Sequence, residues 1–185
     1  MKPKGKGQSV LLLLDIIDIL LKKKVPYAVI GAFAASFYGV IRASLDADAI
    51  ISLAASTINA NELTRIFQKS GLRSVYRQGD SEDPLSGVIR IRDKYDNQVD
   101  LITGIKGMRE DVFGRTITVS FLKRKICLIG IEDFIAMKIF SGSPKDIDDA
   151  KGALKISRQN IDIALLRKLA QRYGKREVKA LEFLL

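Results

Sequence analysis

Apolar side chains near the amino end recur at helical spacing. On a helix over residues 9–24, one side would carry Leu12, Ile16, Ile19 and Leu20. Asp15 and Asp18 would fall on the other side, so this segment is predicted to be an amphipathic helix. Because the two aspartates interrupt the apolar run and no small-residue cleavage site follows it, we do not expect a secretory signal here.

Short apolar segments separated by turn signals follow, and they predict a mixture of strands and helices. Strands are expected over residues 27–30, 44–52, 72–78, 88–93, 98–103, 115–121 and 125–130. Helices are expected from Gly31 to Gly39, from a cap at Asn59 or Asn61 to about Gly71, and over 106–112. From Ile131 onward the pattern is helical. The chain therefore reads as an α/β (α+β) core over residues 1–130, followed by a helical part over residues 131–185 packed on that core.

The strand over residues 44–52 contains two carboxylates among apolar residues. Asp46 and Asp48 point to one side of the strand, about 7 Å apart, while Leu45, Ala47 and Ala49 are expected on the other side. Two aspartates so placed can share a cation or hold a pair of cations. An Asp-x-Asp pair at the end of a strand can also be solvated without any metal, and the pattern by itself leaves both interpretations open.

A third carboxylate, Asp100, lies in the apolar strand over residues 98–103, where an unpaired charge would be costly. It is the best candidate to complete the site. Gly31 has a matching role, because a residue without a Cβ lets phosphates approach the amino end of the next helix, where free N–H groups attract anions.

Composition narrows the chemistry. The chain has no histidine and one cysteine, Cys127, which excludes Ser-His-Asp and Cys-His catalysis, histidine-rich zinc sites and internal disulfides. A site built only from carboxylates prefers hard ions such as Mg²⁺ or Mn²⁺. The single cysteine is consistent with a reducing, cytoplasmic location, and no uncharged run approaches membrane-spanning length, so no membrane association is expected.

The net charge of +10 is concentrated at the two ends of the chain. Residues 1–24 carry +4, residues 151–185 carry +6, and the segment between them is neutral. Basic ends around a neutral body could hold a polyanion such as RNA. Solvated helix faces account for the same charges, and this alternative stays open.

The segment VIGAFAASFYGVIRASLDADAII resembles the first motif of the nucleotidyltransferase superfamily that includes DNA polymerase β. It is most similar to the small prokaryotic branch of AbiEii-type toxins and minimal nucleotidyltransferases. The matching elements are Gly31-Ala32, Tyr38-Gly39 and the run from Arg42 to Asp48. Downstream, IEDFIAMKIFSGSPKDIDDA resembles that family's lysine-bearing helix followed by a Lys-Asp-x-x-Asp helix start. The resemblance covers about residues 25–155.

The resemblance implies a polymerase β-like fold, a mixed sheet flanked by helices with a helical extension, and transfer of a nucleoside monophosphate from an NTP to a hydroxyl. It implies that Asp46, Asp48 and Asp100 bind Mg²⁺ or Mn²⁺ and that Asp100 helps to deprotonate the attacking hydroxyl. The implied nucleotide-binding residues are Gly31, Ala32, Arg42, Ser44, Lys138 and Asp146, and Asp149 would assist. Among the implied partners are an NTP, a tRNA or protein acceptor, and an antitoxin.

Several of these residues also have a purely structural interpretation. Lys138 could be a surface lysine on an amphipathic helix, Arg42 could form a structural salt bridge, and Asp146 could stabilise its helix start. Ala32 replaces the family's usual second Gly or Ser and so removes a hydroxyl contact to phosphate. A noncatalytic RNA- or protein-binding module is therefore the alternative, although a pure scaffold has no chemical need for three acids.

Overall fold

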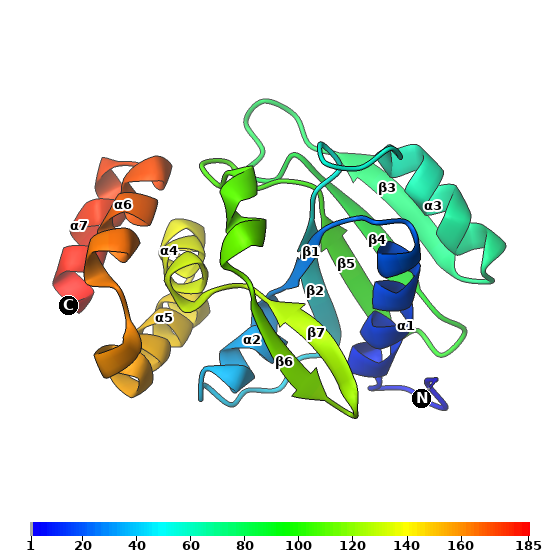
Figure 1. Cartoon of the computed structure of the whole chain (residues 1–185), viewed down its shortest axis with the longest axis horizontal. Coiled ribbons are helices and arrows are strands. Elements are labelled where there is room, and N and C mark those ends of the chain that lie inside the picture. Colours follow the sequence, from blue (N-terminus) through cyan, green and yellow to red (C-terminus); the bar gives the residue numbers. More distant parts are fainter. Residues whose placement is uncertain (1) are drawn as a thin grey trace.

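A seven-stranded mixed sheet forms the centre of the computed structural model, which describes residues 2–185 (Figure 1). Its strands, in chain order, are β1 (Tyr27–Val29), β2 (Asp46–Ile51), β3 (Arg73–Gln78), β4 (Gly87–Arg92), β5 (Gln98–Ile102), β6 (Ile117–Phe121) and β7 (Arg124–Leu128). In the sheet they follow the order β3-β4-β5-β2-β1-β7-β6. The β2–β5 and β1–β7 pairs are parallel and the other pairs are antiparallel. Strand β2, with its two aspartates, is therefore central.

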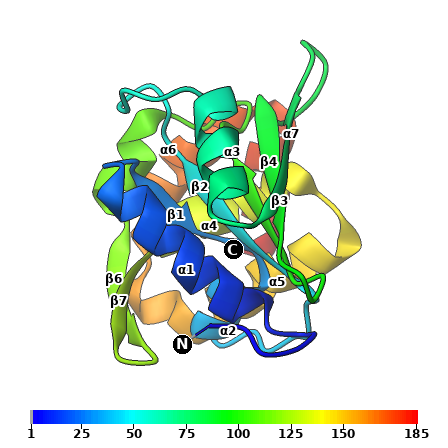
Figure 2. The same cartoon turned by 90° about the vertical axis from the view of Figure 1, so that its right-hand side faces the viewer.

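Helices lie on both sides of this sheet. They are α1 (Ser9–Lys22), α2 (Gly31–Phe37), α3 (Ala60–Lys69), α4 (Ile131–Ser141), α5 (Pro144–Ser157), α6 (Ile163–Tyr173) and α7 (Lys175–Leu184), with the 3-10 helices η1 (Glu110–Arg115) and η2 (Arg158–Asn160). Figure 2 shows α1 and α3 in front of the sheet and the four C-terminal helices behind it. The structure thus confirms the expected fold class.

The amphipathic pattern of the first helix explains how one face of the sheet is covered. The apolar side of α1 is buried against β2 and β5, and α3 packs on β3 and β4. In β2 the side chains of Ala47 and Ala49 are buried. Because side chains alternate along a strand, Asp46 and Asp48 point to the opposite face, which α1 and α3 leave open.

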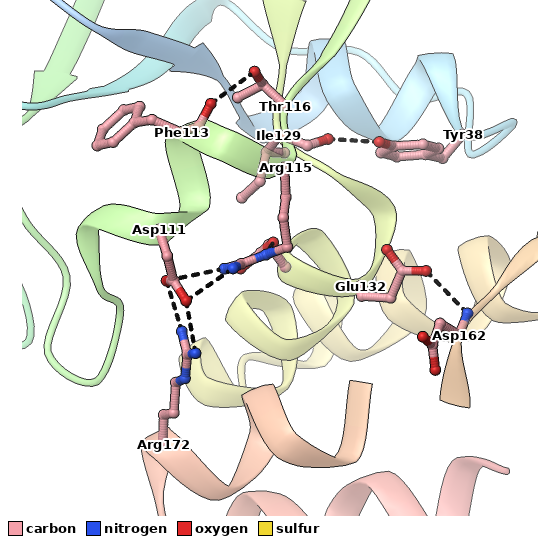
Figure 3. Close-up of polar contacts among 10 residues, drawn as sticks. Tyr38, Asp111, Phe113, Arg115, Thr116, Ile129, Glu132, Asp162 and Arg172 are labelled. Atoms are coloured by element: carbon pink, nitrogen blue, oxygen red, sulfur yellow. Dashed lines mark hydrogen bonds and ion pairs between the residues drawn. The ribbon is translucent and has the colours of Figure 1, made fainter. Parts of the chain in front are cut away.

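Ion pairs at η1 hold the C-terminal helices to the core (Figure 3). Arg172 of α6 donates to both carboxylate oxygens of Asp111 in η1, at 2.8 and 2.7 Å. Arg115, at the end of η1, donates in the same bidentate way to Asp133 of α4, at 2.7 and 2.8 Å. The division of the chain into an α/β core over residues 1–130 and a helical part over residues 131–185 remains a prediction.

The Tyr-Gly pair singled out in the sequence fixes the chain that follows α2. The Tyr38 hydroxyl donates to the carbonyl oxygen of Ile129 at 2.5 Å, just before α4 begins (Figure 3). Gly39 has φ +87°, a left-handed conformation that favours glycine. These two residues therefore link the start of the aspartate-bearing segment to the start of α4.

Two local expectations differ from the structure. The helix expected over residues 106–112 is instead the short η1, shifted toward the carboxyl end, because residues 105–108 form a turn that includes Gly107 at φ +87°. Leu45 precedes β2 and is 87% exposed, so it does not share the buried side of Ala47 and Ala49. Within residues 2–185, none of the helices is both long enough and apolar enough to cross a membrane.

Candidate active site

A cavity of about 540 Å³ opens between the face of the sheet that carries Asp46 and Asp48 and helices α4 and α5. Its walls include seven of the residues expected from the sequence: Gly31, Arg42, Ser44, Asp46, Asp48, Lys138 and Asp146. These residues come from α2, β2, α4, α5 and the segment before β2. The fold thus brings together in one cleft residues that lie more than a hundred positions apart in the chain.

The aspartates of β2 place negative charge on the floor of this cleft. The Ser44 hydroxyl donates to Asp46 Oδ1 at 2.6 Å and so orients that carboxylate. Burial, and then the carboxylates of Asp46 and Asp100, together raise the pKa of Asp48 to about 6, against the opposing effect of Lys138 and Arg42. Near pH 7 the cleft therefore holds carboxylates whose mutual repulsion favours a bound cation.

The third acid lies on the same face of the sheet but is held by an arginine. Asp100 is directly opposite Asp48 in the parallel β2–β5 register and opposite Arg90 in the antiparallel β4–β5 register. Arg90 donates to both of its carboxylate oxygens, at 3.0 and 2.9 Å, and the Gln98 amide donates at 3.2 Å. Asp100 is not among the residues that line the cleft.

The three carboxylates are therefore close enough to influence one another but do not surround one point. Among residues 2–185, no group of three or more Asp, Glu, His or Cys side chains is arranged to hold one metal ion. The pKa of Asp48 nevertheless responds to both other acids, which agrees with Asp100 being near but turned toward Arg90. The structure brings Asp46 and Asp48 together in the cleft and leaves Asp100 beside them.

The pair on β2 suits a hard divalent cation. Its donors are carboxylate oxygens two residues apart on one side of a strand, the ligand type that Mg²⁺ and Mn²⁺ prefer. Burial first, and then the carboxylates of Asp46 and Asp100, raise the pKa of Asp48 more than Lys138 and Arg42 lower it. The residues present thus fit such an ion at Asp46 and Asp48, while Asp100 could join only after leaving Arg90.

Gly31 has a structural reason to be glycine that the sequence did not reveal. Its φ is +66°, and a Cβ at this position would lie 2.3 Å from Asp48 Oδ2. A side chain would therefore displace the carboxylate of Asp48 and also strain the backbone. Gly31 thus makes room for the acid of β2, whether or not it also makes room for phosphates.

Arg42, Asp149, Lys138 and Asp146 form a continuous chain of ion pairs, and all of them except the buried Asp149 line the cleft. Lys138 is only 5% exposed, so it is not a surface lysine. Its Nζ lies 2.8 Å from Asp149 Oδ2 and also pairs with Asp146. Arg42 Nε lies 3.2 Å from both carboxylate oxygens of Asp149. The salt bridge considered for Arg42 is therefore present, and contact of Arg42 or Lys138 with a nucleotide remains a prediction.

Asp146 is held at the start of α5 by several donors. The hydroxyls of Ser141 and Ser143 donate to its Oδ2 at 2.5 and 2.6 Å, and its own backbone N–H donates to the Ser143 hydroxyl at 3.2 Å. Burial opposes ionisation, but the hydrogen bonds from Lys138 and the two serines outweigh it and keep the pKa of Asp146 below its ordinary value. Asp146 thus fixes Lys138 in the wall, and Ser143 caps the helix that Asp146 begins.

A further residue predicted for the site lies outside the cleft, and two residues of the site were missed in the sequence. Ala32 is buried in α2 and does not line the cleft, so its predicted contact with a nucleotide stays a prediction. Arg90, which binds Asp100, was missed. The alternation in the expected strand over residues 88–93 indicates the face on which Arg90 lies, but only the register with β5 shows its partner. Lys145 also lines the cleft and was not singled out.

Comparison with family models and with curated protein sequences finds no match to this chain. Solved structures are similar in fold. ANT(2″)-Ia in complex with adenylyl-2″-tobramycin is 16% identical, with a TM-score of 0.60, covering 90% of this chain and 97% of that chain. An antigenic nucleotidyltransferase-like protein from Paracoccidioides brasiliensis is 16% identical, with a TM-score of 0.60 and coverage of 97% and 88%. The lincosamide antibiotic adenylyltransferase LnuA, bound to lincomycin, is 13% identical, with a TM-score of 0.50 and coverage of 78% and 95%.

At these identities the likeness establishes the fold alone. The seven-stranded mixed sheet with its flanking helices has the architecture of these nucleotidyltransferases.

Proposed function

We propose that this protein is a nucleotidyltransferase that transfers a nucleoside monophosphate from an NTP to an acceptor hydroxyl and releases pyrophosphate. The observation that carries the proposal is the pair Asp46 and Asp48, side by side in a cleft large enough for a nucleotide, with the pKa of Asp48 raised to about 6. Asp46 and Asp48 would hold Mg²⁺ or Mn²⁺ there, which would supply positive charge against the charge that develops on the leaving pyrophosphate.

The positions of the chain's own residues suggest a division of roles. Asp46 and Asp48 would hold the cation, and Lys138 and Lys145 would supply positive charge toward the phosphates from the opposite wall. The acceptor oxygen would bond to the α-phosphorus as the bond from that phosphorus to the pyrophosphate oxygen breaks, and pyrophosphate would leave with the electron pair. Asp100 would accept the hydroxyl proton, which requires that its carboxylate be released from Arg90.

The identity of the acceptor is a finer proposal. The resemblance to AbiEii-type toxins suggests a tRNA or protein acceptor and an antitoxin partner, and the basic ends of the chain favour RNA. The names of ANT(2″)-Ia bound to adenylyl-2″-tobramycin and of LnuA support nucleotide transfer to a small molecule as a further option.

One observation favours the noncatalytic alternative. Arg90 occupies both oxygens of Asp100, so the acid proposed as proton acceptor is already paired. A binding module would keep this pair permanently and would have no use for a free carboxylate. The two functions differ in whether NTP is consumed.

The deciding experiment supplies the purified protein with Mg²⁺ and each α-labelled NTP in turn, with and without total tRNA. The enzyme hypothesis predicts label on RNA, on protein or on a small acceptor, together with pyrophosphate release. Transfer should be lost in the double variant Asp46→Asn, Asp48→Asn. It should persist in Asp148→Asn, which removes an exposed carboxylate of α5 outside the cleft. If the unaltered protein neither transfers label nor releases pyrophosphate, the binding module is favoured.

A further inference from the structure

A second, smaller cavity lies on the same open face of the sheet. It has a volume of about 290 Å³ and is formed by β3, β4 and the segment over residues 79–87. Pro84 and Leu85 line both this cavity and the large cleft, so the two spaces adjoin. A volume of this size is close to the lower limit for small-molecule sites and suits a group about as large as one sugar phosphate.

Two arginines and two apolar residues of β3 and β4 line this smaller cavity. Arg77 of β3 and Arg90 of β4 line it together with Val75 and Val88. In the β3–β4 register Arg77 is opposite Val88 and Arg90 is opposite Val75, so the two arginines are diagonal neighbours, about 7–8 Å apart at their Cα atoms. Two long side chains at this spacing can converge on one anionic group.

Both guanidinium groups are accessible to a ligand. The side chain of Arg77 is 79% exposed and pairs with Asp83 at 3.3 Å, a distance typical of a weak surface contact. The side chain of Arg90 is 54% exposed, although it holds Asp100. Guanidinium groups bind phosphate through two parallel hydrogen bonds, so a phosphate in this cavity could accept hydrogen bonds from both arginines.

The position of Arg90 links this cavity to catalysis. Arg90 donates hydrogen bonds to the carboxylate of Asp100. Asp100 lies on β5, directly opposite Asp48 on β2. A ligand phosphate bound by Arg90 would compete with Asp100 for the guanidinium and would leave that carboxylate free to accept a proton. An acceptor anchored in this way would carry its hydroxyl toward the cleft as it releases the acid.

We infer that the cavity over Arg77 and Arg90 is the acceptor site and that the acceptor carries a phosphate group next to the hydroxyl that is modified. This inference rests on the proposed nucleotidyl transfer. This acceptor site would not suit a substrate that carries several positively charged amino groups, because two arginines would repel such a polycation. The phosphate could belong to a small sugar phosphate or to an RNA strand, and both present the same group to the arginines.

The test measures acceptor binding by isothermal titration calorimetry without NTP, so that it does not depend on the transfer reaction. The probes are ribose 5-phosphate, ribose, tobramycin and a short single-stranded RNA with a 5′-phosphate. We expect ribose 5-phosphate or the RNA to bind at least about tenfold more tightly than ribose or tobramycin, with an affinity that falls as salt is added. Whichever of the two binds identifies the source of the phosphate.

The variants test the site itself. Arg77→Gln should weaken binding of the phosphate probe about tenfold, since it removes one guanidinium from an exposed position. Arg73→Gln is the matched control, because Arg73 is an exposed arginine on the same face of β3 that pairs with Asp96 and lines neither cavity. The control should stay within about twofold of the unaltered protein.

The inference is overturned by equal binding of ribose and ribose 5-phosphate with no binding of RNA, by equal weakening by both arginine variants, or by preferential binding of tobramycin. If NTP is consumed but no phosphate probe binds, the inference fails and the proposed function stands. If a phosphate probe binds through Arg77 but no NTP is consumed with any acceptor, the anion site stands and the transfer reaction is refuted.

Discussion

Replacing Asp48 with asparagine should stabilise the protein at neutral pH. Burial, together with the carboxylates of Asp46 and Asp100, raises the pKa of Asp48 from 3.8 to about 6 in the folded protein. A tenfold change in an ionisation constant corresponds to about 1.4 kcal/mol, so keeping Asp48 ionised above pH 6 costs about 3 kcal/mol. No side-chain hydrogen bond of Asp48 within residues 2–185 would be lost, and asparagine has nearly the same volume.

The pH dependence of this gain follows from the sign of the pKa change. Because the folded protein has the higher pKa, protonated Asp48 favours folding fully below about pH 4, and this contribution is lost as the pH rises through about 6. Asp48→Asn should therefore be more stable than the unaltered protein by about 3 kcal/mol at pH 7.5, or about 6–12 °C in midpoint, and the difference should vanish near pH 3.5.

Urea denaturation at the two pH values, in the presence of a chelator, measures both quantities. Asp148→Asn serves as a control, since this exposed carboxylate of α5 should change the free energy of unfolding by less than about 0.5 kcal/mol at either pH. The reasoning is refuted if Asp48→Asn is no more stable than the unaltered protein at pH 7.5, or if its advantage is the same at pH 3.5.

Three further substitutions test the structure around the site. Gly31→Ala should destabilise the fold by about 1–3 kcal/mol, because the new Cβ meets the carboxylate of Asp48 at a positive φ; an unchanged thermal midpoint would contradict this. Lys138→Met should cost about 3 kcal/mol in urea denaturation, because buried Asp149 keeps only one cationic partner. Asp111→Asn should cost about 1 kcal/mol at pH 7. The hydrogen bonds from the arginines of α6 and then η1 hold the pKa of Asp111 below its usual range, so this loss should be complete above about pH 4, shrink as the pH falls below that value, and disappear only below the lowered pKa of the folded protein.

Local patterns in the sequence were sufficient for the elements and for the direction of several side chains. The alternation around Asp46 and Asp48 predicts a strand with both acids on one face, because side-chain direction in a strand depends only on position along it. The sequence left the cap of α3 open between Asn59 and Asn61, and the structure assigns it to Asn59, which forms a capping box with Glu62.

Relations between distant segments could not be read in this way. The register that places Asp48 opposite Asp100, and Arg90 opposite Asp100, depends on how β2, β4 and β5 pair. A sequence that shows an aspartate in an apolar strand does not show that an arginine from the next strand will bind it.

The burial of Lys138 could not be predicted from the sequence for a related reason. Residues 133–139 of α4 are buried almost all round, because α5, α6 and α7 pack on this helix, and one lysine among them looks like the polar side of an amphipathic helix. Its partner Asp149 lies in the next helix, and only the packing of α4 on α5 makes the pair visible.

The central claim is that Asp46 and Asp48 hold a divalent cation beside the nucleotide, and binding of Mn²⁺ tests it most directly. Electron paramagnetic resonance can count bound Mn²⁺ with the protein alone and with added ATP, after subtraction of the Mn²⁺ that ATP binds by itself. We predict that the unaltered protein and Asp148→Asn bind Mn²⁺, more tightly with ATP, and that Asp48→Asn loses at least about tenfold in affinity. Equal binding by the unaltered protein and Asp48→Asn, or no binding by either, would contradict the claim.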